Sequence, residues 1–215
     1  MSDSRAIDQA IRERRSIRVF RPDPVPRQVI EEILDVARWA PSGSNTQPWR
    51  VTVLGGEQAD TLRRRLEKAA SVRTWTEAQM EAMQTRIANG PMAWILECVD
   101  EPIWQFLAGG SMRFFDAPVA LLVSFPGKRG TSTPAAIPAF VTTLMLAAHA
   151  RGLGTVWLGW PMGQGEIVRE AFQLPEDEQA SAFIALGYPD PDAPVNQARS
   201  TRYGVDEFCR WIGWD

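Results

Sequence analysis

The chain has 215 residues, of which 45% are hydrophobic, and this length predicts one globular domain or one subunit of an oligomer with a substantial core. Its net charge is −3 and its basic residues are dispersed, which argues against a general surface for nucleic acid or anionic membranes. The sequence has no signal-type start and no run of about 18 apolar residues, so we expect a cytoplasmic protein without a membrane segment.

The N-terminal residues predict a short amphipathic helix over 4–16. Ile7 and Ile11 recur four residues apart among charged residues, which is the spacing of one helical face. The helix would present three polar residues at its C-terminal end: Arg14, Arg15 and Ser16.

A second helix is predicted over 25–40, where apolar residues recur at helical spacing and Pro41 ends the pattern. The loop that follows, WAPSGSNTQPWR over 39–50, combines turn-forming residues with a tryptophan near each end. Alternating valines then predict a strand over 49–54.

Residues 57–113 are expected to form a helical insert. The sequence predicts helices over 57–70 and 76–88, followed by a less regular segment that contains tryptophans. The three arginines at 63–65 spread around the circumference of a helix, so we expect them on a solvated face.

The second half of the chain mixes strands and helices without strict alternation. The predicted elements are strand 117–125, helix 139–154, strand 155–161, helix 165–174 and strand 182–190. Strand 117–125 is a continuous apolar run and is expected to be buried on both faces. This mixture predicts a single domain over 1–215 of the α+β class, a sandwich whose central, mainly antiparallel sheet is flanked by helices.

Residues 190–215 cannot form a core of their own. They are rich in proline and aspartate and end with the aromatic residues Phe208, Trp211 and Trp214. We therefore expect an arm that lies on another part of the protein or on a second subunit.

The cysteines and the histidine give no sign of a metal or redox centre. Cys98 and Cys209 lie far apart, outside any metal-ligand spacing, which indicates neither a disulfide framework nor a zinc site. The single histidine, His149, lies in an apolar run and is expected to be a packing residue. We therefore expect no bound metal.

Four segments together resemble the nitroreductase family of flavin enzymes. They are RRSIRVF at 14–20, PVPRQVIEEILDVARWAPSGSNTQPW at 24–49, HARGLGTVWLG at 149–159 and IALGYP at 184–189. Their order and spacing span nearly the whole chain, so the set is more specific than any one segment. The resemblance implies an intertwined homodimer, with FMN at the subunit interface and the arm 190–215 on the partner.

The resemblance also implies where the FMN phosphate and the flavin ring are bound. Three arginines near the two ends of the chain and one serine would bind the phosphate: Arg14, Arg15, Arg202 and Ser16. A guanidinium suits this role because its planar fork donates two parallel hydrogen bonds. Arg18 matches a family cation beside the flavin pyrimidine, where it would stabilise the charge that reduction adds.

The polar loop and one strand end would complete the flavin site. By resemblance, the loop residues that contact FMN are Pro41, Ser42, Gly43, Asn45 and Gln47, with Trp39 and Trp49 fixing the two ends of the loop. Leu158 and Gly159 match the family segment that faces flavin N5. No acid is present there, so we expect a backbone N–H as the donor to N5.

The chain departs from the family in two regions. Many relatives carry an acidic residue before the central helix, where this chain has AIPAF at 136–140, so dimer contacts or access to the pocket would differ. The insert 57–113 varies most among relatives and tends to cover the pocket. We therefore expect substrate choice to depend on residues such as Trp75, Trp104, Arg113 and Phe114.

The resulting hypothesis is an FMN-dependent oxidoreductase with ping-pong kinetics. NADH or NADPH would reduce the flavin, which would then reduce a small organic acceptor, either a nitroaromatic or a quinone. The sequence contains no GxGxxG motif, so it leaves the choice between NADH and NADPH open. Two alternatives stay open: reductive dehalogenation or flavin breakdown on the same scaffold, and a non-catalytic FMN-binding module. Arg18 favours an enzyme, because a storage protein has no need to stabilise a reduced ring.

Overall fold

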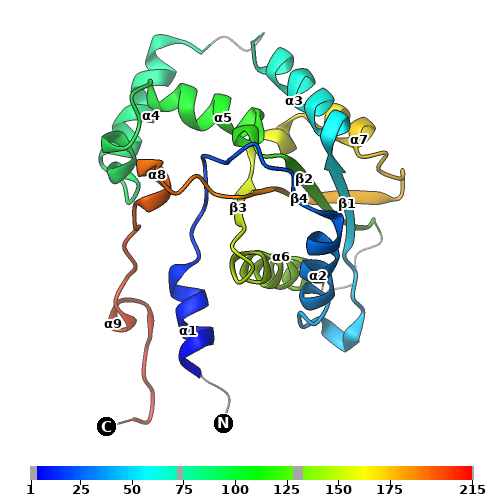
Figure 1. Cartoon of the computed structure of the whole chain (residues 1–215). Helices are drawn as coiled ribbons and strands as arrows, with labels where there is room; N and C mark the ends of the chain where they lie inside the picture. The colour runs from blue at the N-terminus through cyan, green and yellow to red at the C-terminus, as the bar shows by residue number, and fades with distance from the viewer. Residues whose placement is uncertain (1–3, 72–74, 128–132, 215) are drawn as a thin grey trace.

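The computed structural model describes residues 4–71, 75–127 and 133–214. One sheet lies between two layers of helices (Figure 1). The strands are β1 (Arg50–Gly55), β2 (Val119–Pro126), β3 (Gly154–Leu158) and β4 (Glu178–Gly187). The helices are α1 (Ser4–Glu13), α2 (Arg27–Ala37), α3 (Gly56–Ser71), α4 (Glu77–Ala88), α5 (Gly110–Met112), α6 (Thr133–His149), α7 (Gly165–Ala171), α8 (Pro194–Gln197) and α9 (Val205–Phe208).

The sheet has the strand order β1-β2-β4-β3, and each neighbouring pair is antiparallel. Val51 of β1 pairs with Val123 of β2, and Leu122 of β2 pairs with Phe183 of β4. The α+β class and the mainly antiparallel sheet are therefore confirmed. β4 begins at Glu178, earlier than the predicted strand, because its polar first residues pair with the end of β2.

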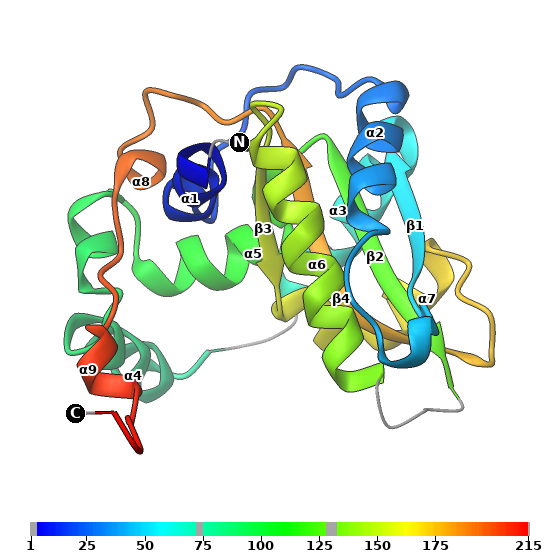
Figure 2. The same ribbon diagram turned by 90° about the horizontal axis from the view of Figure 1, so that it is seen from below.

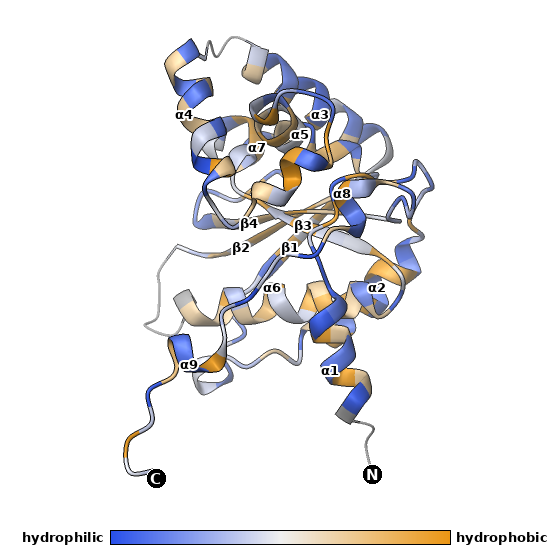
Figure 3. Cartoon of the chain, turned by 90° about the vertical axis from the view of Figure 1, so that its left-hand side faces the viewer, coloured by the Kyte–Doolittle hydropathy of each residue, from blue (hydrophilic) through white to orange (hydrophobic). Residues whose placement is uncertain are grey.

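Each face of the sheet packs on its own hydrophobic core. Along β2, Leu121 and Val123 face α2 and α6, whereas Ala120 and Leu122 face α3, α5 and α7 (Figure 3). These four side chains are at most 1% exposed, which confirms the prediction of a strand buried on both faces. Figure 3 shows the two helical layers above and below the edge of the sheet.

The central helix α6 is longer at its start and shorter at its end than the predicted helix 139–154. The segment AIPAF at 136–140, expected before the helix, lies inside it, and Ile137 is 2% exposed. The apolar face that packs on the sheet outweighs the penalty of Pro138 within the helix. His149 is the last residue of α6.

The arginines at 63–65 are not all solvated, so that prediction is wrong for Arg63. Its side chain is 17% exposed, and its guanidinium carbon lies 4.6 Å from the ring centroid of Phe114. Its Nη2 also donates to the carbonyl of Ala117 at 2.8 Å. Arg63 therefore fastens the insert to the segment that leads into β2.

Both ends of the chain project from the body of the sandwich. Figure 1 shows α1 and the arm that carries α9 extending in the same direction, and Figure 2 shows them on one side of α6. Both segments expose large hydrophobic side chains, including Ile7 at 61%, Phe208 at 71% and Trp214 at 77%. Within the described ranges, no helix is long and apolar enough to cross a membrane.

The segment after α1 is fixed to the edge of the sheet. Ser16 forms a parallel bridge with Thr155 of β3, and the amide of Ile17 donates to the carbonyl of Thr155 at 3.0 Å. The side chain of Ile17, 7% exposed, packs directly over Gly154. The missing side chain of Gly154 lets the two segments approach closely.

Gly154→Ala should therefore destabilise the fold and disturb residues 14–18. An added Cβ at Gly154 would lie 2.6 Å from Cγ1 of Ile17, closer than carbon atoms pack. Overpacking of this kind costs about 1–3 kcal/mol, which urea unfolding would measure. Gly163→Ala is the matched control, because a Cβ added at Gly163 would point into open space, with no described atom within 4 Å. Equal unfolding free energies for the two variants would contradict this account.

Candidate functional site

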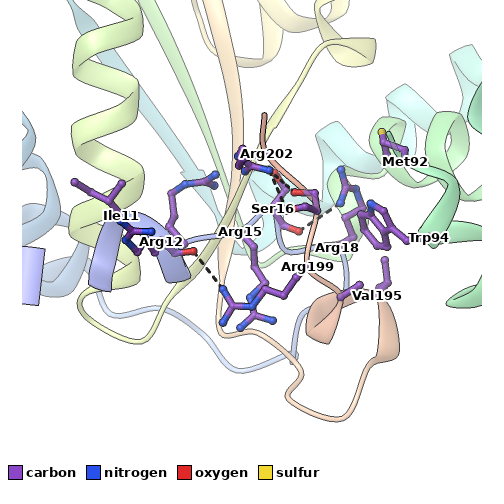
Figure 4. A pocket seen from close by; sticks show the side chains of 13 residues that line it. Ile11, Arg12, Arg15, Ser16, Arg18, Met92, Trp94, Val195, Arg199 and Arg202 are labelled. Carbon is purple, nitrogen blue, oxygen red and sulfur yellow. Dashed lines mark hydrogen bonds between the residues drawn. The ribbon is translucent and has the colours of Figure 1, made fainter. Parts of the chain in front are cut away.

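Six arginines line one cavity of about 520 Å³ between α1, the insert and the C-terminal arm (Figure 4). They are Arg12, Arg14, Arg15, Arg18, Arg199 and Arg202. In the part of the chain that the structure describes, no aspartate or glutamate lines this cavity, and none of the six forms a salt bridge. Such a concentration of unpaired positive charge favours the binding of an anion.

Arg14 and Arg202 come from opposite ends of the chain and repel each other. Burial lowers the pKa of Arg14, and the positive charge of Arg202 lowers that pKa further. Arg202 is oriented by its Nη1, which donates to Oγ of Ser200 at 2.7 Å and to the carbonyl of Thr201 at 2.8 Å. An anion bound beside both guanidiniums would relieve their repulsion.

Arg18 is a cation with few polar neighbours. Burial lowers its pKa from the usual value. Its Nη1 lies 3.4 Å from the carbonyl of Ser16. Met92 and Trp94, from the insert, line the cavity beside it (Figure 4). A desolvated cation in this position favours a ligand that carries or gains negative charge.

Asn196 holds the Arg18 segment on the C-terminal arm. Its Oδ1 accepts from the amides of Arg18 at 2.9 Å and Val19 at 3.3 Å. Its Nδ2 donates to the carbonyls of Val19 at 2.7 Å and Asp190 at 2.9 Å. The side chain is buried, although an asparagine in a proline-rich tail is typical of an exposed turn. Sequence reasoning therefore missed this residue.

The polar loop does not reach this cavity within its own chain. None of the residues 41–47 is among those that line it, and Figure 2 shows α6 between α1 and the loop. The loop is internally organised: the amide of Gln47 donates to Oγ of Ser42 at 3.1 Å, and Nε2 of Gln47 donates to Oδ1 of Asn45 at 3.1 Å. The φ angles of Ser44, Asn45 and Gln47 are 52°, 54° and 42°. Strained backbone of this kind is common at ligand-binding sites.

The two tryptophans of the loop behave differently. Trp49 is 9% exposed and stacks on Phe140 with ring centroids 4.8 Å apart. Trp39 is 79% exposed, so the expectation that it anchors the loop is wrong within a single chain. The reason is that α2 ends before Trp39, which leaves the indole beyond the packed face of the helix.

Leu158 and Gly159 lie at the end of β3. The side chain of Leu158 is 3% exposed and belongs to the core, so only its backbone could contact a ligand, whereas Gly159 is exposed. His149 lines a separate cavity of about 330 Å³ together with Arg14 and Arg15. Burial lowers the pKa of His149.

A second, mainly apolar cavity of about 440 Å³ lies between the helical insert and the segment that follows β3. Its aromatic lining comes from Trp75, Trp104 and Trp160, with centroids of Trp75 and Trp160 5.4 Å apart. Two of the four residues expected to choose the substrate therefore meet in one pocket. Phe114 does not belong to it, because its side chain is fully buried in the core. Arg113 is also absent from its lining and pairs with Glu67 and Asp116.

Among the residues described, no group of three or more histidine, cysteine, aspartate or glutamate side chains is arranged to bind a metal ion.

Comparison with known proteins gives consistent matches over the chain. The sequence profile of the nitroreductase family matches residues 11–188. The chain is 32% identical to the chloronitrobenzene nitroreductase of Comamonas testosteroni over 99% of both proteins. It is 30% identical to the nitrobenzene nitroreductase of Ectopseudomonas oleovorans, again over 99% of each.

The fold is also similar to solved structures. The FMN-dependent nitroreductase NfnB of Mycobacterium smegmatis, solved in complex with NADPH, superposes with a TM-score of 0.81. The two chains are 27% identical, and the match covers 97% of this chain and 99% of the other.

Asn196→Ala should destabilise the protein more than a neighbouring substitution. Removing the side chain takes the acceptor Oδ1 away from the part-buried amides of Arg18 and Val19, and each buried group left unsatisfied costs about 1–3 kcal/mol. Gln197→Ala is the control, because that exposed side chain donates to the carbonyl of Pro191 at 2.9 Å and to no second acceptor among the described residues. Chemical unfolding measures both. If Gln197→Ala lost as much stability as Asn196→Ala, the central role assigned to Asn196 would be wrong.

Proposed function

Because the chain belongs to the nitroreductase family, we propose that it is an FMN-dependent oxidoreductase that reduces aromatic nitro compounds with electrons from NADH or NADPH. The observation that carries the proposal is the arginine cavity, which concentrates positive charge without a carboxylate partner in the described residues. An overall acidic protein that gathers six arginines in one cavity is suited to a phosphate-bearing cofactor.

The residues fit FMN at its phosphate. Arg14 and Arg202 are mutually repelling cations, and Ser16 lines the same cavity with a hydroxyl that could donate to a phosphate oxygen. A phosphomonoester carries a charge of about −1.5 to −2 near neutral pH. We propose that these three residues hold the FMN phosphate, and that Arg18 lies toward the ring.

A second copy of the chain would complete the site. The loop residues Pro41, Ser42, Gly43, Asn45 and Gln47 are well ordered among themselves but do not line the arginine cavity of their own chain. The exposed side chains of α1 and of the arm also need cover, since large apolar surfaces of this kind mark interfaces. We therefore propose a homodimer in which each loop contacts the FMN held mainly by the other subunit, and in which Trp39 is covered at the interface.

When bound, FMN would supply the redox chemistry, accepting a hydride from the dinucleotide and returning two electrons to the acceptor. Arg18 would provide a fixed positive charge where negative charge develops. The backbone at Leu158 and Gly159 would offer an N–H to the ring, because Leu158 buries its side chain. One site serving donor and acceptor in turn would give ping-pong kinetics. In the described residues no carboxylate lines the arginine cavity, so product protons would come from water.

We propose that the acceptor is an aromatic nitro compound, with quinones as a second class. The tryptophan cavity supports an aromatic substrate, because Trp75, Trp104 and Trp160 offer flat apolar surfaces in one place. The names of the two relatives, a chloronitrobenzene and a nitrobenzene nitroreductase, support the nitro group.

The proposed function can be tested with the purified protein. We expect a flavin absorption spectrum, bleaching of that spectrum on anaerobic mixing with NADPH or NADH, and recovery of the oxidised spectrum on addition of nitrobenzene. A colourless protein that cannot be reconstituted with FMN would overturn the cofactor. If the flavin stayed oxidised for minutes with both donors, the oxidoreductase proposal would be wrong and the protein would be a non-catalytic FMN-binding module.

Arg18→Gln and Arg202→Gln should separate redox tuning from phosphate binding. A hydrogen bond to a charged group contributes about 1.5–3 kcal/mol, and for a two-electron couple ~1.4 kcal/mol corresponds to about 30 mV. Loss of the Arg18 cation should thus lower the flavin midpoint potential by roughly 30–60 mV while oxidised FMN stays bound. Arg202→Gln should weaken FMN retention and leave the potential nearly unchanged. Equal shifts in a redox titration of both variants would contradict this division.

A further inference from the structure

We propose that Arg15 and Arg199 form a second anion site, which recognises the 2′-phosphate of NADPH and so makes NADPH the preferred electron donor. This site rests on the proposed function, because it requires a nicotinamide dinucleotide as donor. NADPH differs from NADH only by this phosphomonoester, and an arginine is a common partner for it in dinucleotide-binding proteins.

The two arginines converge on one place from different elements. Arg15 follows α1, and its Nη1 donates to the carbonyls of Asn196 at 2.8 Å and Gln197 at 3.0 Å. Arg199 lies on the arm, and its Nη1 lies 3.3 Å from the carbonyl of Arg12 at the end of α1. Figure 4 shows the two side chains ending side by side. Each guanidinium is therefore oriented through one terminal nitrogen, which leaves its other N–H groups for a ligand.

The charges around this pair favour a phosphate. Burial lowers the pKa of Arg15, and the positive charge of Arg199 lowers it further, whereas Glu13 raises it. Glu13 offsets only part of this effect: its Oε1 accepts from Gln9 at 2.9 Å, and within the described ranges it forms no salt bridge with either arginine. Two guanidiniums that converge without a carboxylate between them match the geometry of a phosphomonoester.

The pair is separate from the residues that would hold the FMN phosphate. The positive charge of Arg202 lowers the pKa of Arg14, whereas the positive charge of Arg199 lowers the pKa of Arg15. In Figure 4, Ser16 and Arg202 lie together, away from the ends of Arg15 and Arg199. One cavity thus contains two groups of cations, which suits two phosphates. Arg15 is thereby assigned to the donor, in place of the FMN phosphate to which the family resemblance assigned it.

Ligand binding to the FMN-loaded protein tests the site without turnover. Isothermal titration calorimetry would compare 2′,5′-ADP, which carries the 2′-phosphate, with 5′-AMP, which lacks it. We expect 2′,5′-ADP to bind at least about tenfold more tightly, and Arg199→Gln to remove about tenfold of its affinity while 5′-AMP is unaffected. The control is Arg64→Gln, which removes the same charge from an exposed position on α3. Equal affinities of the wild-type protein for the two nucleotides would overturn the proposal.

Steady-state kinetics with both donors distinguish the 2′-phosphate from other anions. Arg199→Gln should raise KM for NADPH about tenfold, leave KM for NADH unchanged and retain FMN fully. Equal losses with both donors would assign the pair to the shared pyrophosphate, and loss of FMN would assign it to the cofactor; either result overturns the inference. A protein that binds 2′,5′-ADP as expected but oxidises neither donor would contradict the proposed function and leave the phosphate site supported.

Discussion

Six arginines repel one another in one cavity, and the contacts around the cavity hold them together against this repulsion. Guanidiniums gathered without a carboxylate partner in the described residues destabilise the ligand-free protein, so rigid neighbours must hold them in place. The bridge between Ser16 and Thr155 fixes one segment to the sheet, and Asn196 fixes the arm to that segment. A bound phosphate would remove this repulsion. It would bind tightly because the arginines are already in position and each gains an anionic partner without moving.

Stability and binding are supplied by different parts of the chain. The two cores on either face of the sheet form a rigid frame, with β2 between them and buried except at its last residue. The arginines, in contrast, come from the segments that leave this frame: the end of α1, the residues just after it, and the C-terminal arm. The insert contributes apolar surface, through Met92 and Trp94 at the arginine cavity and through Trp75 and Trp104 at the second cavity, where Trp160 joins them from the segment after β3. Phosphate-binding and aromatic surfaces thus have separate origins in the sequence.

A single chain leaves several features without a partner. The loop after α2 has a strained backbone but does not line the arginine cavity of its own chain. Trp39, at the start of the loop, is exposed. The ends of the chain carry isoleucines, a phenylalanine and tryptophans that solvent does not favour. The homodimer that we propose would account for all of these features, because a second copy would receive the arms and contribute its loop to the site.

Local patterns in the sequence were sufficient to predict most elements and the fold class, whereas the candidate site residues came from the family resemblance. Helical spacing in α2 and the apolar run of β2 are such patterns, and the arginines at 14–18 and at 202 could be recognised from short segments because their chemistry is specific. Which of these groups meet is a property of the folded chain. Contacts between distant segments decide the start of α6, the burial of Arg63 and the hydrogen bonds of Asn196. They also bring Arg15 and Arg199 to one cavity. The spacing of apolar residues predicts which face of a helix or strand is buried. Which residues then contact each other depends on how the helices and strands pack in the folded chain.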